Sequence, residues 1–313
     1  MNHYLGIDIG GTFVKGVLID ENGKILSDGS VPTGCSGGGD NMCENIGALC
    51  ADLQSRAHVT AVSAGVGCAG MIAADGTVVF AGNLNLKNYP LAKKLSALLN
   101  IPVTVTNDAN AAALGEAVFG AGKGYADSVF ITLGTGVGGG IIIGGKLFQG
   151  GNNAGAEVGH MVIVHGGEKC TCGRRGCFEA YSSATALIKA TKAAMKDNPS
   201  SAMWQCGGLE QVTGKTAFDY SECDGAAKEV VDGYIYHLAC GIINLANIFR
   251  PQAVILGGGV AEQGERLIVP LQERLDKKIF GGQSYAPVKI VKASLGNLAG
   301  ALGAAAACRG ARP

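Results

Sequence analysis

The chain has 313 residues, of which 47% are hydrophobic and 16% are charged. This length predicts two domains, each with enough apolar residues for a buried sheet. The formal net charge of zero gives no electrostatic footprint for nucleic acid or an anionic membrane, so we expect neither as a partner.

The apolar stretches of the sequence indicate neither a membrane helix nor a secretory signal. No secretory signal precedes the first apolar run at Tyr4, and five glycines interrupt the most apolar stretch, 129–143. A membrane helix needs about 20 mostly apolar residues, so we expect a soluble chain. The eleven cysteines are an odd number in a long chain, unlike a short disulfide scaffold. Scattered cysteines such as Cys50, Cys68 and Cys240 are expected to be buried thiols.

The first part of the chain predicts an antiparallel meander followed by alternating helices and strands. Glycine-containing turns at 10–11 and 22–23 separate three expected strands, at 4–9, 12–20 and 24–31. The next expected elements are a helix near 40–57, a strand at 61–66, a helix at 90–99 and a strand at 103–106. Asn107 and Asp108 then start a helix to about 119, with Asp108 as the expected N-cap.

The opening pattern then recurs 124 residues later. Expected strands at 129–133, 139–143 and 146–148 repeat the plan of strand, glycine turn, strand, turn, strand. Such a repeat indicates a duplicated unit, and chance similarity between two glycine-rich hairpins is the alternative. The remaining expected elements are helices at 182–197 and 224–249, strands at 253–256 and 288–291, and a helix at 297–308. This alternation predicts an α/β protein with a domain boundary near 118–126.

The first glycine turn is a candidate phosphate site. Gly10 and Gly11 let backbone N–H groups approach a phosphate closely, and Thr12 and Lys15 follow them. Asp8 ends a buried strand, where a carboxylate suits a water-mediated contact to Mg-ATP. An ordinary hairpin turn with a capping aspartate is the alternative.

Two further glycine turns are candidates for the rest of a nucleotide. The second turn comprises Gly134, Thr135, Gly136, Val137 and Gly138. It fits a G-x-G-x-x-G pattern, but a dinucleotide fold needs a helix next, and 141–143 is typical of a strand. A phosphate clamp is therefore favoured over NAD binding. In the third turn, Gly257, Gly258 and Gly259 offer a flat surface for adenine or ribose, or else form a tight strand-to-helix turn.

Asn107 and Asp108 lie at the end of a predicted strand, where ligands gather in α/β sheets. A carboxylate at this place could accept the proton of an attacking hydroxyl. Capping the following helix is a competing role, and the two roles are compatible.

Cys170, Cys172 and Cys177 have C-x-C-x4-C spacing. With one histidine they form a Cys3His set, a common composition of closed, tetrahedral zinc sites. His160 and His165 compete as the fourth ligand, and spacing does not decide between them. Unrelated thiols or a disulfide are the alternatives, and a cytosolic context disfavours the disulfide.

Together these motifs resemble the ROK family of sugar kinases, particularly its bacterial glucokinase branch, over essentially the whole chain. The resemblance rests on the opening motif at 8–15, on Asn107-Asp108 and on the turn at 133–139. It rests most strongly on Glu157-x-Gly159-His160 with Cys170-x-Cys172-Gly173-x-x-Gly176-Cys177-x-Glu179.

The resemblance implies an α/β, two-domain actin-like fold (ASKHA, ribonuclease-H-like) with a cleft between the domains. The N-terminal domain would span 1–118, with the helix at 297–313 packing back on it. The larger domain, 119–296, would carry the zinc loop and the adenosine site. A homodimer or a higher homo-oligomer is also implied.

The resemblance further implies ATP-dependent phosphorylation of a hexose, with Zn2+ as a structural ion and Mg2+ bound with ATP. Glucose, converted to glucose 6-phosphate, is the first expectation; N-acetylmannosamine, N-acetylglucosamine, allose and fructose are alternatives. Asp108 would be the catalytic base, and His160 would be preferred over His165 for zinc, with its other ring nitrogen on the sugar. The implied sugar ligands are Asn83, Asn107, Asp108, Glu157, His160 and Glu179. The implied ATP and phosphate ligands are Asp8, Gly10, Gly11, Thr12, Lys15, Gly134, Thr135, Gly136, Val137, Gly138, Gly257, Gly258 and Gly259.

Two positions depart from the family pattern. Ala69 and Gly82 stand where proline is frequent, in loops that the resemblance assigns to the sugar pocket, which leaves another hexose open. A sugar-sensing regulator without turnover is the rival of another class, and the intact Asp108 argues against it. We expect no room for an N-terminal DNA-binding domain before the strand at residue 4, and zero net charge disfavours a zinc-dependent nucleic-acid module. A cytoplasmic enzyme of carbohydrate metabolism, within glycolysis, is expected.

Overall fold

The computed structural model describes residues 1–309 and divides into two compact units. The first unit contains Met1–Ala126, Gly140–Ala156 and the chain from Ser294 onward; the second contains Asp127–Gly139 and Glu157–Ala293. Residues 310–313 of the expected C-terminal helix lie outside the described residues, and the expected boundaries at 118/119 and 296/297 stay predictions. Within residues 1–309, no helix combines the length and the apolar character needed to cross a membrane.

The first unit is built on a five-stranded sheet with the order β3-β2-β1-β4-β8. Its strands are β1 (His3–Ile9), β2 (Phe13–Asp20), β3 (Ile25–Pro32), β4 (Ser63–Cys68) and β8 (Val103–Asn107). The first three strands form the predicted antiparallel meander, which is confirmed, and β4 and β8 extend the sheet in parallel. The strand expected at 61–66 lies two residues further along.

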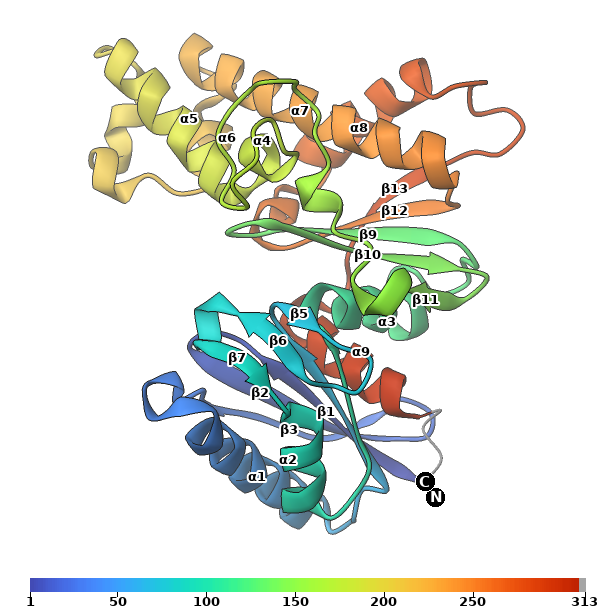
Figure 1. The fold of residues 1–313 in the computed structure, drawn as a ribbon. Helices are drawn as coiled ribbons and strands as arrows, with labels where there is room; N and C mark the ends of the chain where they lie inside the picture. Colours follow the sequence, from blue (N-terminus) through green and yellow to red (C-terminus); the bar gives the residue numbers. More distant parts are fainter. Residues whose placement is uncertain (310–313) are drawn as a thin grey trace. The chain divides into compact units, whose positions relative to one another are not determined.

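Helices cover both faces of this sheet (Figure 1). The helices α1 (Gly38–Ala57) and α2 (Leu91–Leu99) pack on one face, and α3 (Asp108–Phe119) and α9 (Ala299–Cys308) are associated with the other. The period of two in a strand divides β1 accordingly. Leu5, Ile7 and Ile9 belong to the core with α1, whereas Tyr4 belongs to the core with α9.

Glycines let α9 approach the sheet at backbone distance. A Cβ atom on Gly6 would lie 1.9 Å from the Ala301 carbonyl oxygen, and one on Gly65 would lie 1.8 Å from that of Ala304. On the helix itself, a Cβ on Gly303 would lie 1.7 Å from the carbonyl oxygen of Ala111 in α3. These contacts are backbone to backbone, so larger residues cannot be accommodated by a side-chain rotation.

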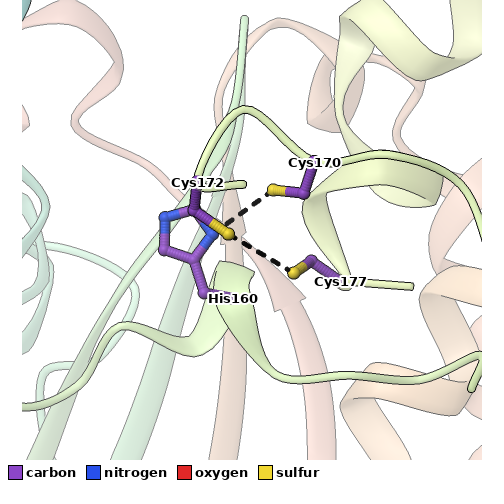
Figure 2. A group of neighbouring side chains, drawn as sticks. All are labelled: His160, Cys170, Cys172 and Cys177. Atoms are coloured by element: carbon purple, nitrogen blue, oxygen red, sulfur yellow. Dashed lines mark hydrogen bonds between the residues drawn. The ribbon is translucent and has the colours of Figure 1, made fainter. Parts of the chain in front are cut away.

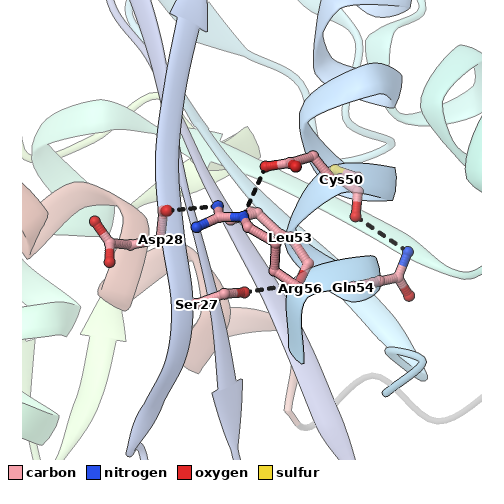
Figure 3. A network of polar contacts seen from close by, with 7 residues as sticks. Ser27, Asp28, Cys50, Leu53, Gln54 and Arg56 are labelled. Atoms are coloured by element: carbon pink, nitrogen blue, oxygen red, sulfur yellow. Dashed lines mark hydrogen bonds and ion pairs between the residues drawn. The ribbon is translucent and has the colours of Figure 1, made fainter. Parts of the chain in front are cut away.

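Polar contacts fix the end of α1 to strand β3 (Figure 3). The Ser27 hydroxyl donates to the Leu53 carbonyl at 2.8 Å, and the Arg56 guanidinium donates to the Asp28 carbonyl at 2.7 Å. Because Ser27 is buried, its bond avoids the cost of an unsatisfied hydroxyl and sets how α1 lies along the strand.

A small three-stranded sheet in the first unit was not predicted. It consists of β5 (Met71–Ile72), β6 (Val78–Ala81) and β7 (Leu86–Tyr89), in that order. A short 3-10 helix, Gly82–Leu84, connects β6 to β7 and carries Asn83, whose side chain is exposed.

The second sheet has the order β11-β10-β9-β12-β13. Its strands are β9 (Ser128–Leu133), β10 (Val137–Ile143), β11 (Lys146–Phe148), β12 (Ala253–Gly257) and β13 (Lys289–Lys292). The strand β10 begins in the second unit and ends in the first, where it pairs with β11. The three consecutive strands β9, β10 and β11 follow the plan that the sequence repeat predicts. The strands β12 and β13 add in parallel, as β4 and β8 do in the first sheet.

The second unit also contains several α-helices (Figure 1). They are α4 (Glu179–Ser182), α5 (Ala184–Asp197), α6 (Thr216–Tyr220), α7 (Gly225–Phe249) and α8 (Glu265–Lys278). The long helices α5 and α7 agree with the predicted segments. A 3-10 helix, Gly259–Gln263, follows the third glycine turn, and α8 comes after it.

Candidate active site and metal centre

Asp8 is a mostly buried carboxylate near the end of β1. It faces α9, where a Cβ atom on Gly300 would lie 2.7 Å from the Asp8 carboxyl carbon. Burial, and then the nearby charge of Asp108, raise the pKa of Asp8 to about 6, while its cross-strand partner Lys15 acts in the opposite direction. Because the charge of Asp108 acts on Asp8, the two carboxylates lie close together, in one site of the first unit.

Asn107, and not Asp108, caps helix α3. Asn107 has an extended backbone, and its side-chain oxygen accepts from the N–H groups of Ala109 at 2.9 Å and Asn110 at 3.2 Å. The predicted N-cap at Asp108 is therefore wrong: Asp108 is the first helical residue, one position too late for this geometry. Its Oδ1 accepts from the Ala109 N–H, and burial raises the pKa of Asp108.

The amide group of Asn107 also fixes the loop that follows β4. Its nitrogen donates to the Gly70 carbonyl oxygen at 3.1 Å. Asn107 thus caps the helix through its amide oxygen and anchors the loop through its amide nitrogen. Both contacts hold the start of α3, where Asp108 lies.

The first glycine turn is tied to the end of β3. The Gly10 N–H donates to the Phe13 carbonyl at 3.0 Å, and the Thr33 hydroxyl donates to the Gly10 carbonyl at 2.7 Å. Gly10, Gly11 and Thr12 are themselves exposed, so their backbone is accessible to a ligand.

The second glycine turn joins β9 to β10 and is held by residues that follow the last clustered cysteine. The Gly134 carbonyl accepts from the Ala184 N–H at 2.8 Å, and the Thr135 carbonyl accepts from the Thr185 hydroxyl at 2.8 Å. The Val137 N–H donates to Glu179 Oε2 at 3.1 Å. A strand follows these glycines, as predicted, and not the helix that a dinucleotide fold requires.

Four side chains of the second unit gather as a candidate metal centre (Figure 2). The ligand atoms of His160, Cys170, Cys172 and Cys177 all lie within 4.8 Å of one another. Cys170 Sγ lies 3.6 Å from His160 Nδ1, and the sulfurs of Cys172 and Cys177 lie 3.7 Å apart. His165 is exposed and is not part of this group.

These distances match a tetrahedral ion. With Zn–S bonds near 2.3 Å and a Zn–N bond near 2.0 Å, two sulfurs lie about 3.8 Å apart, and a sulfur and a nitrogen lie about 3.5 Å apart. A disulfide would instead need about 2.05 Å between sulfurs. The donor set and its spacing therefore fit one four-coordinate metal ion.

Backbone contacts bring His160 to the cysteines. Val162 pairs with Cys177 in an isolated bridge, and the Phe178 N–H donates to the Met161 carbonyl at 2.7 Å. A tight turn, in which the Cys170 N–H donates to the Arg174 carbonyl at 2.9 Å, presents the first two thiols. The backbone N–H of Arg174 also lowers the pKa of the exposed Cys172 thiol, which favours the thiolate that a metal requires.

The two carboxylates near this centre have different surroundings. Glu157 is exposed and precedes the short 3-10 helix Val158–His160. Glu179 begins α4 and is bound on both oxygens: Oε1 accepts from the Thr171 hydroxyl at 3.0 Å, and Oε2 accepts from the Val137 N–H. Sequence reasoning missed Thr171 and Thr185, because no spacing pattern marks a threonine that bonds to a distant partner.

The sequence profile of the ROK family matches residues 4–310. The chain belongs to the ROK family. A glucokinase of Streptomyces coelicolor is 36% identical over 96% of both chains. A xylose repressor of Bacillus subtilis is 29% identical over 96% of this chain and 75% of the repressor.

A solved ROK structure has the same fold. The ROK family glucokinase from Streptomyces griseus, in complex with glucose and AMPPNP, is 35% identical, with a TM-score of 0.84 over 99% of this chain and 100% of that chain. The predicted actin-like α/β fold is thereby confirmed.

Within this ROK chain, the predicted residues fall into two groups. Those of the first unit are Asp8, Gly10, Gly11, Thr12, Lys15, Asn83, Asn107 and Asp108. Those of the second are the turn at 134–138, the metal centre with Glu157 and Glu179, and the turn at 257–259. In the last of these, Gly258 has a φ of 83°, and a Cβ atom there would lie 2.6 Å from the Leu133 backbone.

Proposed function

We propose that this ROK protein is a glucokinase, which transfers the γ-phosphoryl group of ATP to glucose and forms glucose 6-phosphate. The observation that carries the proposal is the mostly buried Asp108 carboxylate at the start of α3, close to the second carboxylate of Asp8, which precedes the first glycine turn. Glucokinases that match the chain over nearly its full length support the choice of sugar.

Asp108 would act as the general base. It would take the proton from the sugar hydroxyl as that oxygen attacks the γ-phosphorus, while the bond to the ADP oxygen breaks. Burial raises the pKa of Asp108, which makes the ionised carboxylate a better proton acceptor. Asn83 and Asn107 would hold sugar hydroxyls in the same unit.

Backbone donors and one carboxylate would bind the phosphates. The turn at 10–12, with Lys15, and the turn at 134–138 would present N–H groups to the polyphosphate. Mg2+ bound with ATP would neutralise phosphate charge, and Asp8 would hold it through water. The glycines 257–259 would accept the adenosine.

We propose zinc as the ion of the metal centre. Three thiols and an imidazole are ligands that zinc prefers, and the distances between them suit its tetrahedral geometry. Because His160 Nδ1 faces the cysteines, His160 would bind the metal through Nδ1 and leave Nε2 for a sugar hydroxyl. Glu157 and Glu179 would hold further hydroxyls.

The rival is a sugar-binding regulator, since a xylose repressor is also a relative. The test is ADP release from Mg-ATP with a panel of hexoses and N-acetylhexosamines. We expect the highest kcat/KM for glucose. Binding of a sugar by calorimetry, without ADP release, would support the regulator instead.

Family membership also leads us to propose a cytoplasmic homo-oligomer, with a homodimer as the simplest form. Sedimentation velocity at micromolar concentration tests the assembly, and a monomer at all concentrations would contradict it.

A further inference from the structure

The second glycine turn owes its shape to one neighbouring segment. Residues 179–185 supply three hydrogen bonds to it: from Ala184 to Gly134, from Thr185 to Thr135, and from Val137 back to Glu179. A Cβ atom on Gly136 would lie 2.3 Å from Glu179 Oε2, so a larger residue there would displace this carboxylate.

These bonds determine where the turn's own N–H groups point. A trans peptide unit is planar, and its C=O and N–H point in opposite directions. Holding the carbonyls of Gly134 and Thr135 toward Ala184 and Thr185 therefore directs the N–H groups of Thr135 and Gly136 away from that segment. Neither N–H group has a partner within residues 1–309. The Val137 N–H, in contrast, is engaged by Glu179.

The segment is anchored to the metal centre at one end and to the core elsewhere. Cys177 belongs to the metal group, and Phe178 beside it is fully buried. The Tyr234 hydroxyl donates to the Ser182 carbonyl at 2.7 Å. Thr171, from between two of the cysteines, donates to Glu179 Oε1, which also lies 3.6 Å from Cys170 Sγ, and so contributes to the orientation of that carboxylate.

We infer that Thr185 and Thr171 are positioning residues for the nucleotide, because they hold the turn whose N–H groups are proposed above to bind the phosphates. The inference rests on the proposed function. Thr185 acts only through the Thr135 peptide, whereas Thr171 acts through Glu179, which is also assigned to the sugar. Through Thr171 the segment between the clustered cysteines would support ATP as well as sugar.

The test measures nucleotide affinity without turnover. The dissociation constant of Mg-AMPPNP is determined by calorimetry in the absence of sugar, and that of glucose is determined separately. Thr185→Val keeps the shape of the side chain and removes the donor, so we expect AMPPNP to bind roughly 3- to 10-fold more weakly. Glucose affinity should not change, and Thr185→Ser should restore nucleotide affinity.

Two further variants sharpen the comparison. Ser221→Ala is the matched control, because Ser221 also donates a hydroxyl to a carbonyl, that of Phe218 at 3.0 Å, at the end of α6. It should leave both affinities unchanged. Thr171→Val should weaken the binding of both AMPPNP and glucose, since it removes one of the hydrogen bonds that orient the Glu179 carboxylate.

Two outcomes separate this inference from the proposed function. An AMPPNP affinity within twofold of wild type in both Thr185→Val and Thr185→Ala would overturn the inference alone. AMPPNP binding by the wild type without glucose phosphorylation would contradict the proposed function. Weaker AMPPNP binding by Thr185→Val than by that wild type would still support the positioning role. Thr185 is exposed, so melting temperatures near that of wild type should show that each variant is folded.

Discussion

Asp108 and Asn107 are neighbours with separate tasks, and the separation makes Asp108 testable. Asn107 holds the N-terminus of α3 through two backbone N–H groups, so the helix does not depend on Asp108 for its cap. A change at Asp108 should therefore report on chemistry and not on helix stability.

Asp108→Asn should lower kcat by roughly 10²- to 10⁴-fold, because it removes the carboxylate that accepts the proton. Glucose affinity should be largely kept, since an amide still hydrogen-bonds a hydroxyl. Separate measurement of kcat and of the glucose dissociation constant checks this. Asn107→Ala is the contrast, with an expected loss of about 0.5–2 kcal/mol of stability as the cap is removed. Turnover within a few-fold of wild type in folded Asp108→Asn would exclude the base role.

The mostly buried Asp8 carboxylate should make the free energy of unfolding depend on pH. Its pKa is about 6 in the folded protein against an ordinary value of 3.8, so the folded state favours the protonated form. The stabilising effect of protonation is complete below pH 3.8 and is lost as the pH rises through 6. Asp8→Asn should therefore gain stability relative to wild type between pH 4.5 and pH 7.5, by up to ~2 kcal/mol.

Denaturant unfolding of the nucleotide-free protein at the two pH values measures this gain. Asp20→Asn is a control of opposite sign, because the backbone N–H of Lys24 lowers the pKa of the Asp20 carboxyl. Its loss should destabilise the protein at the higher pH. A stability difference for Asp8→Asn that does not depend on pH would contradict the burial argument.

At the scale of elements, the loop at 160–177, which carries the four candidate metal ligands, also positions side chains that do not bind the metal. Cys172→Ser should lower zinc content and glucose affinity together, since the proposed ion would hold the loop between Glu157 and Glu179. Elemental analysis, melting temperature and glucose calorimetry measure the effect. Cys223→Ser is the matched control, because Cys223 is an exposed free cysteine outside the metal group. Wild-type protein purified without zinc would refute the assignment.

Elements with a clear periodicity or a glycine boundary could be predicted from the sequence, and very short ones could not. The meander and the helices α1, α5 and α7 are long enough to show a pattern. The strands β5 to β7 have two to four residues each, less than a reliable alternation needs.

The site residues likewise divide into those that the sequence could predict and those that it could not. The three cysteines are visible by spacing, but only the pairing of Val162 with Cys177 shows why His160 and not His165 joins them. The contact of Thr185 with Thr135 spans 50 residues and depends on a backbone carbonyl, so it leaves no trace in composition or spacing.

At the scale of the whole molecule, the first unit is assembled from both ends of the chain. Helix α9 packs on β1, β4 and α3 through glycines that leave no room for a side chain. Gly303→Ala should destabilise the protein by about 1–3 kcal/mol, because its methyl group would meet the Ala111 carbonyl and force the two helices apart.

Urea unfolding compares this variant with Gly233→Ala, a matched change in α7 where nothing lies within 4 Å of the added carbon. The control should be neutral or more stable by up to about 1 kcal/mol, from helix propensity alone. Equal stability of the two variants would show that α9 can move away from α3.

The placement of α9 has a consequence for the order of events during synthesis. When the ribosome has made residues 1–126, the face of the meander that carries Tyr4, Val17 and Ile19 still lacks its cover, which is supplied by residues 299–308. The second unit has all of its residues once Ala293 has emerged. The segment that is translated first therefore completes its core last, in contrast to the usual N-terminal-first order. Throughout elongation the nascent chain carries an uncovered apolar sheet face, and it is in this interval that a chaperone would have its binding site.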